Sequence, residues 1–157
     1  MTTDRNRLLL VNGPNLNLLG SREPELYGTA TLTDVEKLAI ATAAEFGLEM
    51  CTVQSNHEGV LIDAIHESRR ECCGVVINPG AFTHTSIAIA DALAAVDLPV
   101  AEVHLTNIQR REAFRHHSYV STVADVVIAG AGVLGYQLAV RYLATRVGVL
   151  TRKGCRP

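Results

Sequence analysis

The alternation of two hydrophobic patterns along this chain of 157 residues constrains its fold most strongly. Short apolar runs of the strand type cover residues 7–11, 49–54, 74–78, 99–104 and 125–129. Longer runs with helical spacing cover residues 34–46, 58–72, 84–96 and 134–147. Strands that alternate with helices are typical of parallel sheets covered on both faces. We therefore predict an α/β fold, a doubly wound five-stranded parallel sheet, in a single domain over residues 1–157.

The ends of two segments carry local signals. Thr33 to Glu36 is predicted to form a capping box at the start of the first helix, and Gly47 lies where that helix would end. Residues 150–157 are predicted to form a mobile C-terminal tail.

A loop punctuated by glycine and proline, residues 12–28, follows the first strand. Loops of this length in a compact domain are usually functional lids or disordered segments. An arginine about 4 Å from a tyrosine would lower the tyrosine pKa by roughly three units. Arg22 could therefore make Tyr27 a usable base near neutral pH. Alternatively, Arg22 pairs with Glu23 or Glu25 on the surface, and Tyr27 covers an apolar edge.

The loop after the third strand begins Asn78-Pro79-Gly80 and contains His84. Ligands of doubly wound sheets bind outside the carboxyl ends of the strands, so Asn78 and His84 are candidate binders of hydroxyl or carboxylate groups. We expect the next helix to begin near His84, with its amide groups facing the same crevice. Alternatively, Asn78 only makes a local turn, and Thr83 or Ser86 only caps the helix.

The fourth strand carries Glu102 and His104 in an otherwise apolar run. Side chains two positions apart lie on one face of a strand, close enough for a carboxylate to bond an imidazole. A buried acid needs a partner. Glu102 is therefore predicted to orient His104 as a general acid. Alternatively, His104 bonds a backbone carbonyl, and Glu102 pairs with an arginine.

Basic residues follow the fourth strand. If this segment is helical, Arg111 and Arg115 share a face, and one of them could reach the crevice. The adjacent His116 and His117 lack the spacing of a metal site, so we predict no metal.

The segment Gly130 to Gly135 reads GAGVLG, the GxGxxG pattern of dinucleotide-binding turns. Such a turn needs an acidic residue about 20 positions further on, but no Asp or Glu follows Asp125. We therefore interpret these glycines as a tight turn with close helix packing. A nucleotide-dependent enzyme that uses them stays an alternative.

The composition narrows the function classes. A formal net charge of -2 with a pI near 6.3 shows no excess of basic residues of the kind that binds nucleic acid. No run approaches the length of a membrane span or a signal peptide. A positive mean hydropathy of +0.18 suggests that some apolar surface is covered by other subunits. The cysteines, which form no CxxC pair and are expected to be reduced thiols of a cytoplasmic protein, are Cys51, Cys72, Cys73 and Cys155.

Three segments, residues 12–28, 78–93 and 102–118, closely resemble the type II 3-dehydroquinate dehydratases in sequence and order. The resemblance spans essentially the whole chain. It implies a flavodoxin-like fold and assembly as a dodecamer, a tetramer of trimers. It also implies conversion of 3-dehydroquinate to 3-dehydroshikimate with loss of water, as in the shikimate pathway of aromatic amino acid biosynthesis. The family uses no metal, nucleotide or Schiff-base lysine, so no cofactor is expected.

The resemblance also implies roles for individual residues. Tyr27 matches the base that removes a proton from C2, made acidic by Arg22, and Asn15 matches the residue beside a water that stabilises the enolate. His104, oriented by Glu102, matches the acid that protonates the departing C1 hydroxyl. The loop over residues 12–28 matches a lid in the family.

Other matches concern substrate binding. Asn78, His84 and Arg115 match positions that bind substrate hydroxyls. Leu105 and Thr106 match positions that receive the substrate carboxylate. Asp91 matches an aspartate that reaches the site of a neighbouring subunit.

The chain departs from the family pattern at three positions. Ala90 replaces a frequent basic residue beside the implied subunit contact. Phe82 replaces a common tyrosine, and Thr106 replaces the usual serine but keeps its hydroxyl.

A second alternative class is a flavodoxin-like module without catalysis, such as a receiver domain. Receiver domains need carboxylates at the ends of their early strands. Here Asn12 and Asn78 occupy those ends.

Overall fold

The computed structural model describes residues 5–21, 25 and 28–153, and side chains up to residue 148. Its sheet consists of five parallel strands in the order β2-β1-β3-β4-β5. The strands are β1 (Arg7–Asn12), β2 (Glu49–Gln54), β3 (Cys72–Asn78), β4 (Val100–His104) and β5 (Val126–Ala129). This order is that of the flavodoxin-like fold, in which the direction of winding changes between β1 and β3. The predicted fold class is confirmed.

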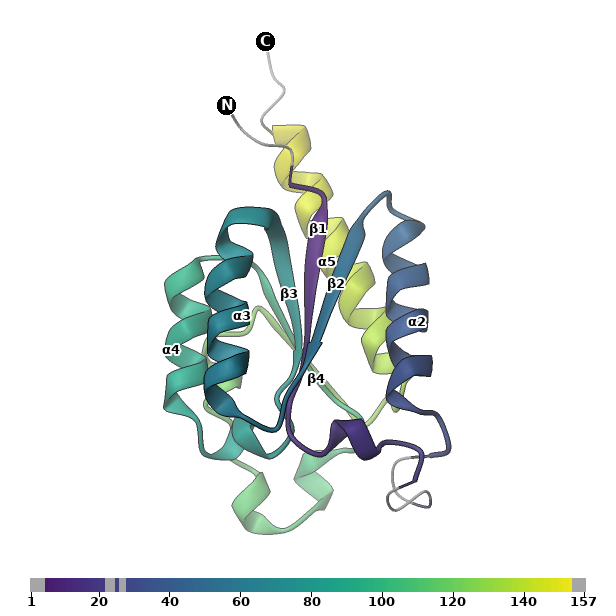
Figure 1. Ribbon diagram of the computed structural model, residues 1–157, viewed down its shortest axis with the longest axis vertical. Helices are drawn as coiled ribbons and strands as arrows, with labels where there is room; N and C mark the ends of the chain where they lie inside the picture. The colour runs from purple at the N-terminus through teal and green to yellow at the C-terminus, as the bar shows by residue number, and fades with distance from the viewer. Residues whose placement is uncertain (1–4, 22–24, 26–27, 154–157) are drawn as a thin grey trace.

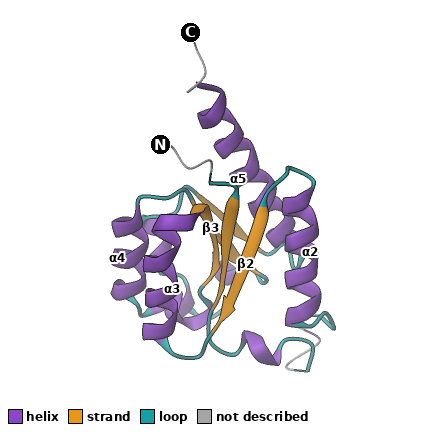
Figure 2. Ribbon diagram, turned by 45° about the horizontal axis from the view of Figure 1, so that its top comes forward, coloured by secondary structure: helices purple, strands orange, loops and turns teal. Residues whose placement is uncertain are grey.

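Helices cover both faces of the sheet (Figures 1 and 2). One face is covered by α3 (Glu58–Glu71) and α4 (Ile87–Val96), and the other by α2 (Leu32–Ala44) and α5 (Leu134–Lys153). Among the described residues, none of the helices combines the length and apolar character that a membrane span requires.

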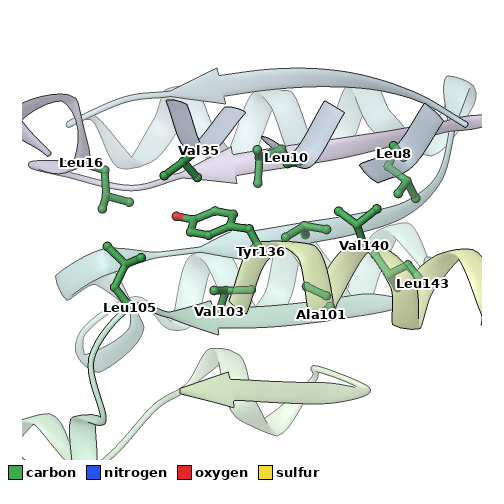
Figure 3. Close-up of a cluster of buried hydrophobic side chains, with 14 of the residues drawn as sticks. Leu8, Leu10, Leu16, Val35, Ala101, Val103, Leu105, Tyr136, Val140 and Leu143 are labelled. Carbon is green, nitrogen blue, oxygen red and sulfur yellow. The ribbon is translucent and has the colours of Figure 1, made fainter. Parts of the chain in front are cut away.

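Alternation along β1 builds a separate core on each face of the sheet. Leu8 and Leu10 lie in the cluster under α2 and α5, whereas Leu9 and Val11 lie in the cluster under α3 and α4. Successive side chains of a strand point to opposite faces, so a strand buried on both faces must be apolar throughout. Figure 3 shows the first cluster, which also contains the ring of Tyr136.

The ends of the helices differ from the sequence predictions. The capping box joins Thr31 and Asp34 instead of Thr33 and Glu36, because the Thr31 hydroxyl accepts from the Asp34 amide and the Asp34 carboxylate accepts from the Thr31 amide. At the other end of the chain, the last helix continues to Lys153, past its predicted end at 147. Residues 154–157 of the predicted tail lie outside the described residues.

The prediction that α4 begins near His84 is wrong. His84 ends a separate 3₁₀ helix, Gly80–His84, and α4 begins at Ile87. The Ser86 hydroxyl caps α4 by accepting a hydrogen bond of 2.9 Å from the Ile89 amide. The amide groups at the start of α4 therefore follow Ser86 and are not those of the 3₁₀ helix that ends at His84.

The glycines at 130–135 make a tight turn and a close packing contact. Gly130 and Gly132 have φ of 87° and 59°, in the left-handed region that glycine tolerates best. A Cβ atom on Gly135 would lie 3.2 Å from Cγ1 of Val103. The interpretation of these glycines as a tight turn and close helix packing is confirmed.

The loops after β1 and β3 touch at Gly13. Its amide donates to the Asn78 carbonyl at 2.8 Å, and an added Cβ would lie only 2.2 Å from the Pro79 carbonyl oxygen. Because both groups belong to the backbone, no side-chain rotation relieves that contact.

We therefore expect Gly13→Ala to destabilise the protein by about 2 kcal/mol or more, the cost of overpacking a rigid site. Gly59→Ala in α3 is the matched control, because an added Cβ there meets nothing within 4 Å. Urea unfolding at equal protein concentration measures both changes. Equal stability of the two variants would contradict the expectation.

Candidate active site

A crevice with a volume of about 220 Å³ opens at the carboxyl ends of β1, β3 and β4. The loops that follow these strands surround it, at the lower edge of the sheet in Figure 1. Its lining residues are Pro14, Asn15, Leu16, Leu19, Asn78, Gly80, Ala81, His84, His104, Leu105, Thr106, Ile108, Arg111 and Arg115.

Most of the residues predicted for the site converge on this crevice. The predicted residues that line it are Asn15, Asn78, His84, His104, Leu105, Thr106 and Arg115. Glu102 lies behind His104, whereas the exposed Asp91 does not line the crevice of its own chain. Arg22 and Tyr27 lie outside the described residues.

His104 and Glu102 form a buried pair. Nε2 of the imidazole lies 2.7 Å from Oε1 of Glu102, and both side chains are almost completely buried. Because an ionised carboxylate only accepts hydrogen bonds, Nε2 carries the donated proton. The alternative, in which His104 bonds a backbone carbonyl and Glu102 pairs with an arginine, is wrong for the described residues.

Three hydroxyl groups complete the surroundings of Glu102. Oε1 accepts from Thr83 at 2.6 Å and from Ser118 at 2.9 Å, and Oε2 accepts a short hydrogen bond from Ser121. Burial raises the pKa of Glu102, but the hydrogen bonds from His104, Ser121 and Thr83 outweigh it and leave that pKa below its usual value of 4.5. The carboxylate therefore stays charged.

Asn78 combines the two roles that the sequence left open. Its Oδ1 accepts from the Gly80 amide at 3.1 Å, which is a local turn, and the residue also lines the crevice. Its Nδ2 donates to the phenolic oxygen of Tyr136 at 2.8 Å.

His84 presents an acceptor to the crevice. Its Nδ1 lies 2.7 Å from the His117 carbonyl oxygen, so Nδ1 carries a proton. Burial lowers the pKa of His84, and the nearby His104 and Arg115 lower it further. The neutral ring therefore leaves Nε2 as a hydrogen-bond acceptor.

The basic segment after β4 differs from the predicted helical turn. It forms two short 3₁₀ helices, Ile108–Arg110 and Ala113–Arg115, so Arg111 lies between them. Both Arg111 and Arg115 line the crevice, where the sequence predicted only one. Glu112 holds Arg115 by a hydrogen bond of 3.0 Å to its Nε.

Asn15 enters the crevice from a strained position. Its φ of 67° lies in the left-handed region, and its amide donates to Oδ1 of Asn56 at 2.9 Å. Within the described ranges, no group of three or more His, Cys, Asp or Glu side chains is placed to hold a metal ion.

Sequence reasoning missed four side chains that support the site. They are Thr83, Ser118 and Ser121 around Glu102, and Tyr136 behind Asn78. The only available signal was indirect, because a buried acid requires donors without indicating which residues supply them.

The chain is similar to known proteins in both sequence and structure. The sequence model of the family described as Dehydroquinase class II matches residues 6–144. A catabolic 3-dehydroquinase 2 from Aspergillus flavus is 61% identical over 147 residues, covering 93% of this chain and 98% of that protein. A 3-dehydroquinate dehydratase from Cereibacter sphaeroides is 57% identical over 138 residues, covering 88% of this chain and 94% of that protein. The crystal structure of a type II dehydroquinase from Propionibacterium acnes superimposes with a TM-score of 0.85 at 46% identity, covering 89% of this chain and 97% of that one.

The surroundings of Glu102 generate a pH-dependent stability. A carboxyl group with a lowered pKa in the folded state contributes stability that is present above its unfolded pKa and lost as pH falls through the folded value. Removing the Ser121 hydroxyl raises the folded pKa toward 4.5. We expect Ser121→Ala to lose about 1–2 kcal/mol of unfolding free energy at pH 7, with a deficit that shrinks below pH 4.5.

Thr122→Val is the matched control for this measurement. Among the described residues, the Thr122 hydroxyl donates to the Tyr119 carbonyl alone, at 2.6 Å, so the effect of removing it should not depend on pH. Denaturant unfolding of both variants between pH 7 and pH 3 tests the expectation. A Ser121→Ala deficit that stays constant across this range would contradict it.

Proposed function

The chain belongs to the class II dehydroquinase family, and we infer from this that it is a 3-dehydroquinate dehydratase, a hydro-lyase that converts 3-dehydroquinate to 3-dehydroshikimate. The family match over residues 6–144 carries this conclusion. The crevice supports it, because it offers a paired acid and several polar groups to a small polar substrate.

We propose that two residues divide the proton transfers. Tyr27, as a phenolate favoured by Arg22, removes a proton from C2, which is acidic because C3 is a carbonyl carbon. The electron pair moves to the C3 oxygen as an enolate. Collapse of the enolate breaks the bond between C1 and its hydroxyl oxygen, and His104 donates a proton so that water leaves. The assignments of Tyr27 and Arg22 rest on the sequence match over residues 12–28.

The geometry around His104 supports its role as the acid. Glu102 occupies Nε2, so Nδ1 is the nitrogen that remains for the substrate. We propose that the imidazolium form of His104 gives up the Nδ1 proton to the leaving hydroxyl. An elimination beside a ketone needs only a base and an acid, and we propose that neither a metal nor a cofactor takes part.

Substrate contacts follow from the donors and acceptors in the crevice. We propose that Asn78, His84 and Arg115 bind the substrate hydroxyls. Leu105 and Thr106, directly after β4, receive the carboxylate, and Asn15 holds a water beside the enolate oxygen. His84 supports this assignment because its neutral ring leaves Nε2 to accept from a hydroxyl group.

We also propose a cytoplasmic homododecamer, a tetramer of trimers, in which Asp91 reaches the crevice of a neighbouring subunit. Asp91 is exposed on α4 and does not line the crevice of its own chain, which supports a role in another subunit. The same reaction can serve aromatic amino acid biosynthesis through the shikimate pathway or the breakdown of quinate.

The reaction itself is tested by mixing the purified protein with 3-dehydroquinate and following the ultraviolet absorbance of the conjugated enone product. We expect Tyr27→Phe to remove nearly all turnover while substrate affinity stays largely intact, because only a transition-state role is lost. Tyr142→Phe in α5 is the control, since the described contact of its hydroxyl is with Arg146 at 3.4 Å. Turnover retained by Tyr27→Phe would exclude Tyr27 as the base.

The proposed role of Asp91 is tested with hybrid oligomers. We expect Tyr27→Phe and Asp91→Ala to be nearly inactive alone but to regain activity when refolded together. In a hybrid, an Asp91→Ala subunit keeps Tyr27 and receives Asp91 from its neighbour. Random mixing would restore up to about one quarter of the wild-type activity. No recovery in an assembled hybrid would place Asp91 in its own subunit or outside the site.

A further inference from the structure

A phenol group lies buried beneath the crevice. Tyr136, on α5, has no exposed surface, and Figure 3 shows its oxygen at the end of the ring nearest Leu16 and Leu105, two residues that line the crevice. The phenol donates to Oδ1 of Asn12 at 2.9 Å and accepts from Nδ2 of Asn78 at 2.8 Å. It therefore links the last residue of β1 to the last residue of β3.

The hydrogen atoms of this network have one consistent arrangement. The Gly80 amide can only donate, so it fixes Oδ1 of Asn78 on its side and Nδ2 on the side of Tyr136. The single phenolic hydrogen goes to Asn12, so the phenolic oxygen is free to accept from Asn78. Nδ2 of Asn78 carries two hydrogens, the contacts of the described residues use one of them, and Asn78 lines the crevice.

We propose that Tyr136 is a positioning residue, which holds the Asn78 amide so that one N–H group is offered to a substrate hydroxyl oxygen. This inference rests on the proposed function, in which Asn78 binds substrate. Without the phenol, the amide would keep only its bond to the Gly80 amide and could rotate about its side-chain bonds. Burial raises the pKa of Tyr136, so its hydroxyl stays protonated and continues to donate to Asn12.

The network leaves a polar group of Asn12 without a partner. Asn12 is completely buried, and its Nδ2 has no hydrogen-bond partner within the described part of the chain. Leaving a buried donor unpaired costs about 1–3 kcal/mol. An apolar side chain of the same shape would avoid that cost. The presence of asparagine at this position is therefore explained by its side-chain oxygen, which accepts the hydrogen bond from Tyr136.

The glycine-rich turn before α5 gives Tyr136 its place. The Gly130 amide donates to the His104 carbonyl at 3.1 Å, and the Gly132 amide donates to the Leu105 carbonyl at 3.0 Å. Gly135 then packs against Val103, where a Cβ atom would lie 3.2 Å from a side-chain carbon. The segment that resembles a dinucleotide-binding turn thus holds the start of α5 against the end of β4. It also places the next residue, Tyr136, directly beneath the crevice.

A double-mutant cycle tests whether Tyr136 acts through Asn78. We expect Tyr136→Phe, which keeps the ring, to lower kcat/KM by about tenfold, mainly through a higher KM, because a contact made in both ground state and transition state is weakened. In the Asn78→Ala background, Tyr136→Phe should change kcat/KM less than twofold, because the group that it positions is absent. Tyr142→Phe, a tyrosine of the same helix whose described hydroxyl contact is Arg146, should match the wild type.

A purely structural role for Tyr136 predicts a different result. It would lower the melting temperature and leave KM unchanged, or it would affect kcat/KM equally in both backgrounds. Either result, measured on a correctly assembled oligomer, would overturn the inference. Failure of Asn78→Ala to change KM would instead refute the proposed role of Asn78 in substrate binding, so the two failures are distinguishable.

A second variant covers the case in which Tyr136→Phe does not assemble. Asn12→Leu nearly preserves the shape of the side chain, removes its unpaired Nδ2 and deprives the phenol of its acceptor. The phenolic hydrogen would then compete for Oδ1 of Asn78, which turns the amide away from its present orientation. We expect KM to rise by about the same factor as for Tyr136→Phe. An unchanged KM in this variant would also overturn the inference.

Discussion

The carboxylate of Glu102 has no exposed surface, and the site is arranged around that buried charge. An unpaired ion in the interior costs several kcal/mol, so the charge persists only because every donor around it is in place. Those donors come from β4 itself, from the 3₁₀ helix Gly80–His84 and from the segment 118–121. One charge therefore fixes three segments relative to one another and also fixes which nitrogen of His104 faces the crevice.

Hydrophobic periodicity predicted the sheet well because each strand is buried on both faces and reads as a continuous apolar run. Helix ends were predicted less well, because several hydroxyl residues stand within a few positions and the choice among them depends on contacts distant in sequence. Thr31 caps the first helix where the sequence suggested Thr33. Ser86 caps α4, which begins only after the separate 3₁₀ helix Gly80–His84 has ended. Local pattern thus identified each of these helices but misplaced its first turn.

Much of the site was predictable for one physical reason. Parallel strands end at the same edge of a sheet, so polar residues at the ends of β1, β3 and β4 had to converge. The partners behind them could not be predicted. Tyr136 lies 58 positions from Asn78 in an apolar helix, and nothing local marks its hydroxyl as part of a network. The hydroxyls around Glu102 were equally hidden, because serine and threonine are common in turns whatever they bond.

The two cores separated by the sheet support the crevice from two sides. Glu102 is supported from the side of α3 and α4, whereas Asn78 is supported by Tyr136 from the side of α2 and α5. Sequence drift in the core under α3 and α4 therefore alters the surroundings of Glu102 and of the 3₁₀ helix Gly80–His84. Drift in the core under α2 and α5 instead alters how Tyr136 holds Asn78, so the two strand ends can change separately although they meet in one crevice.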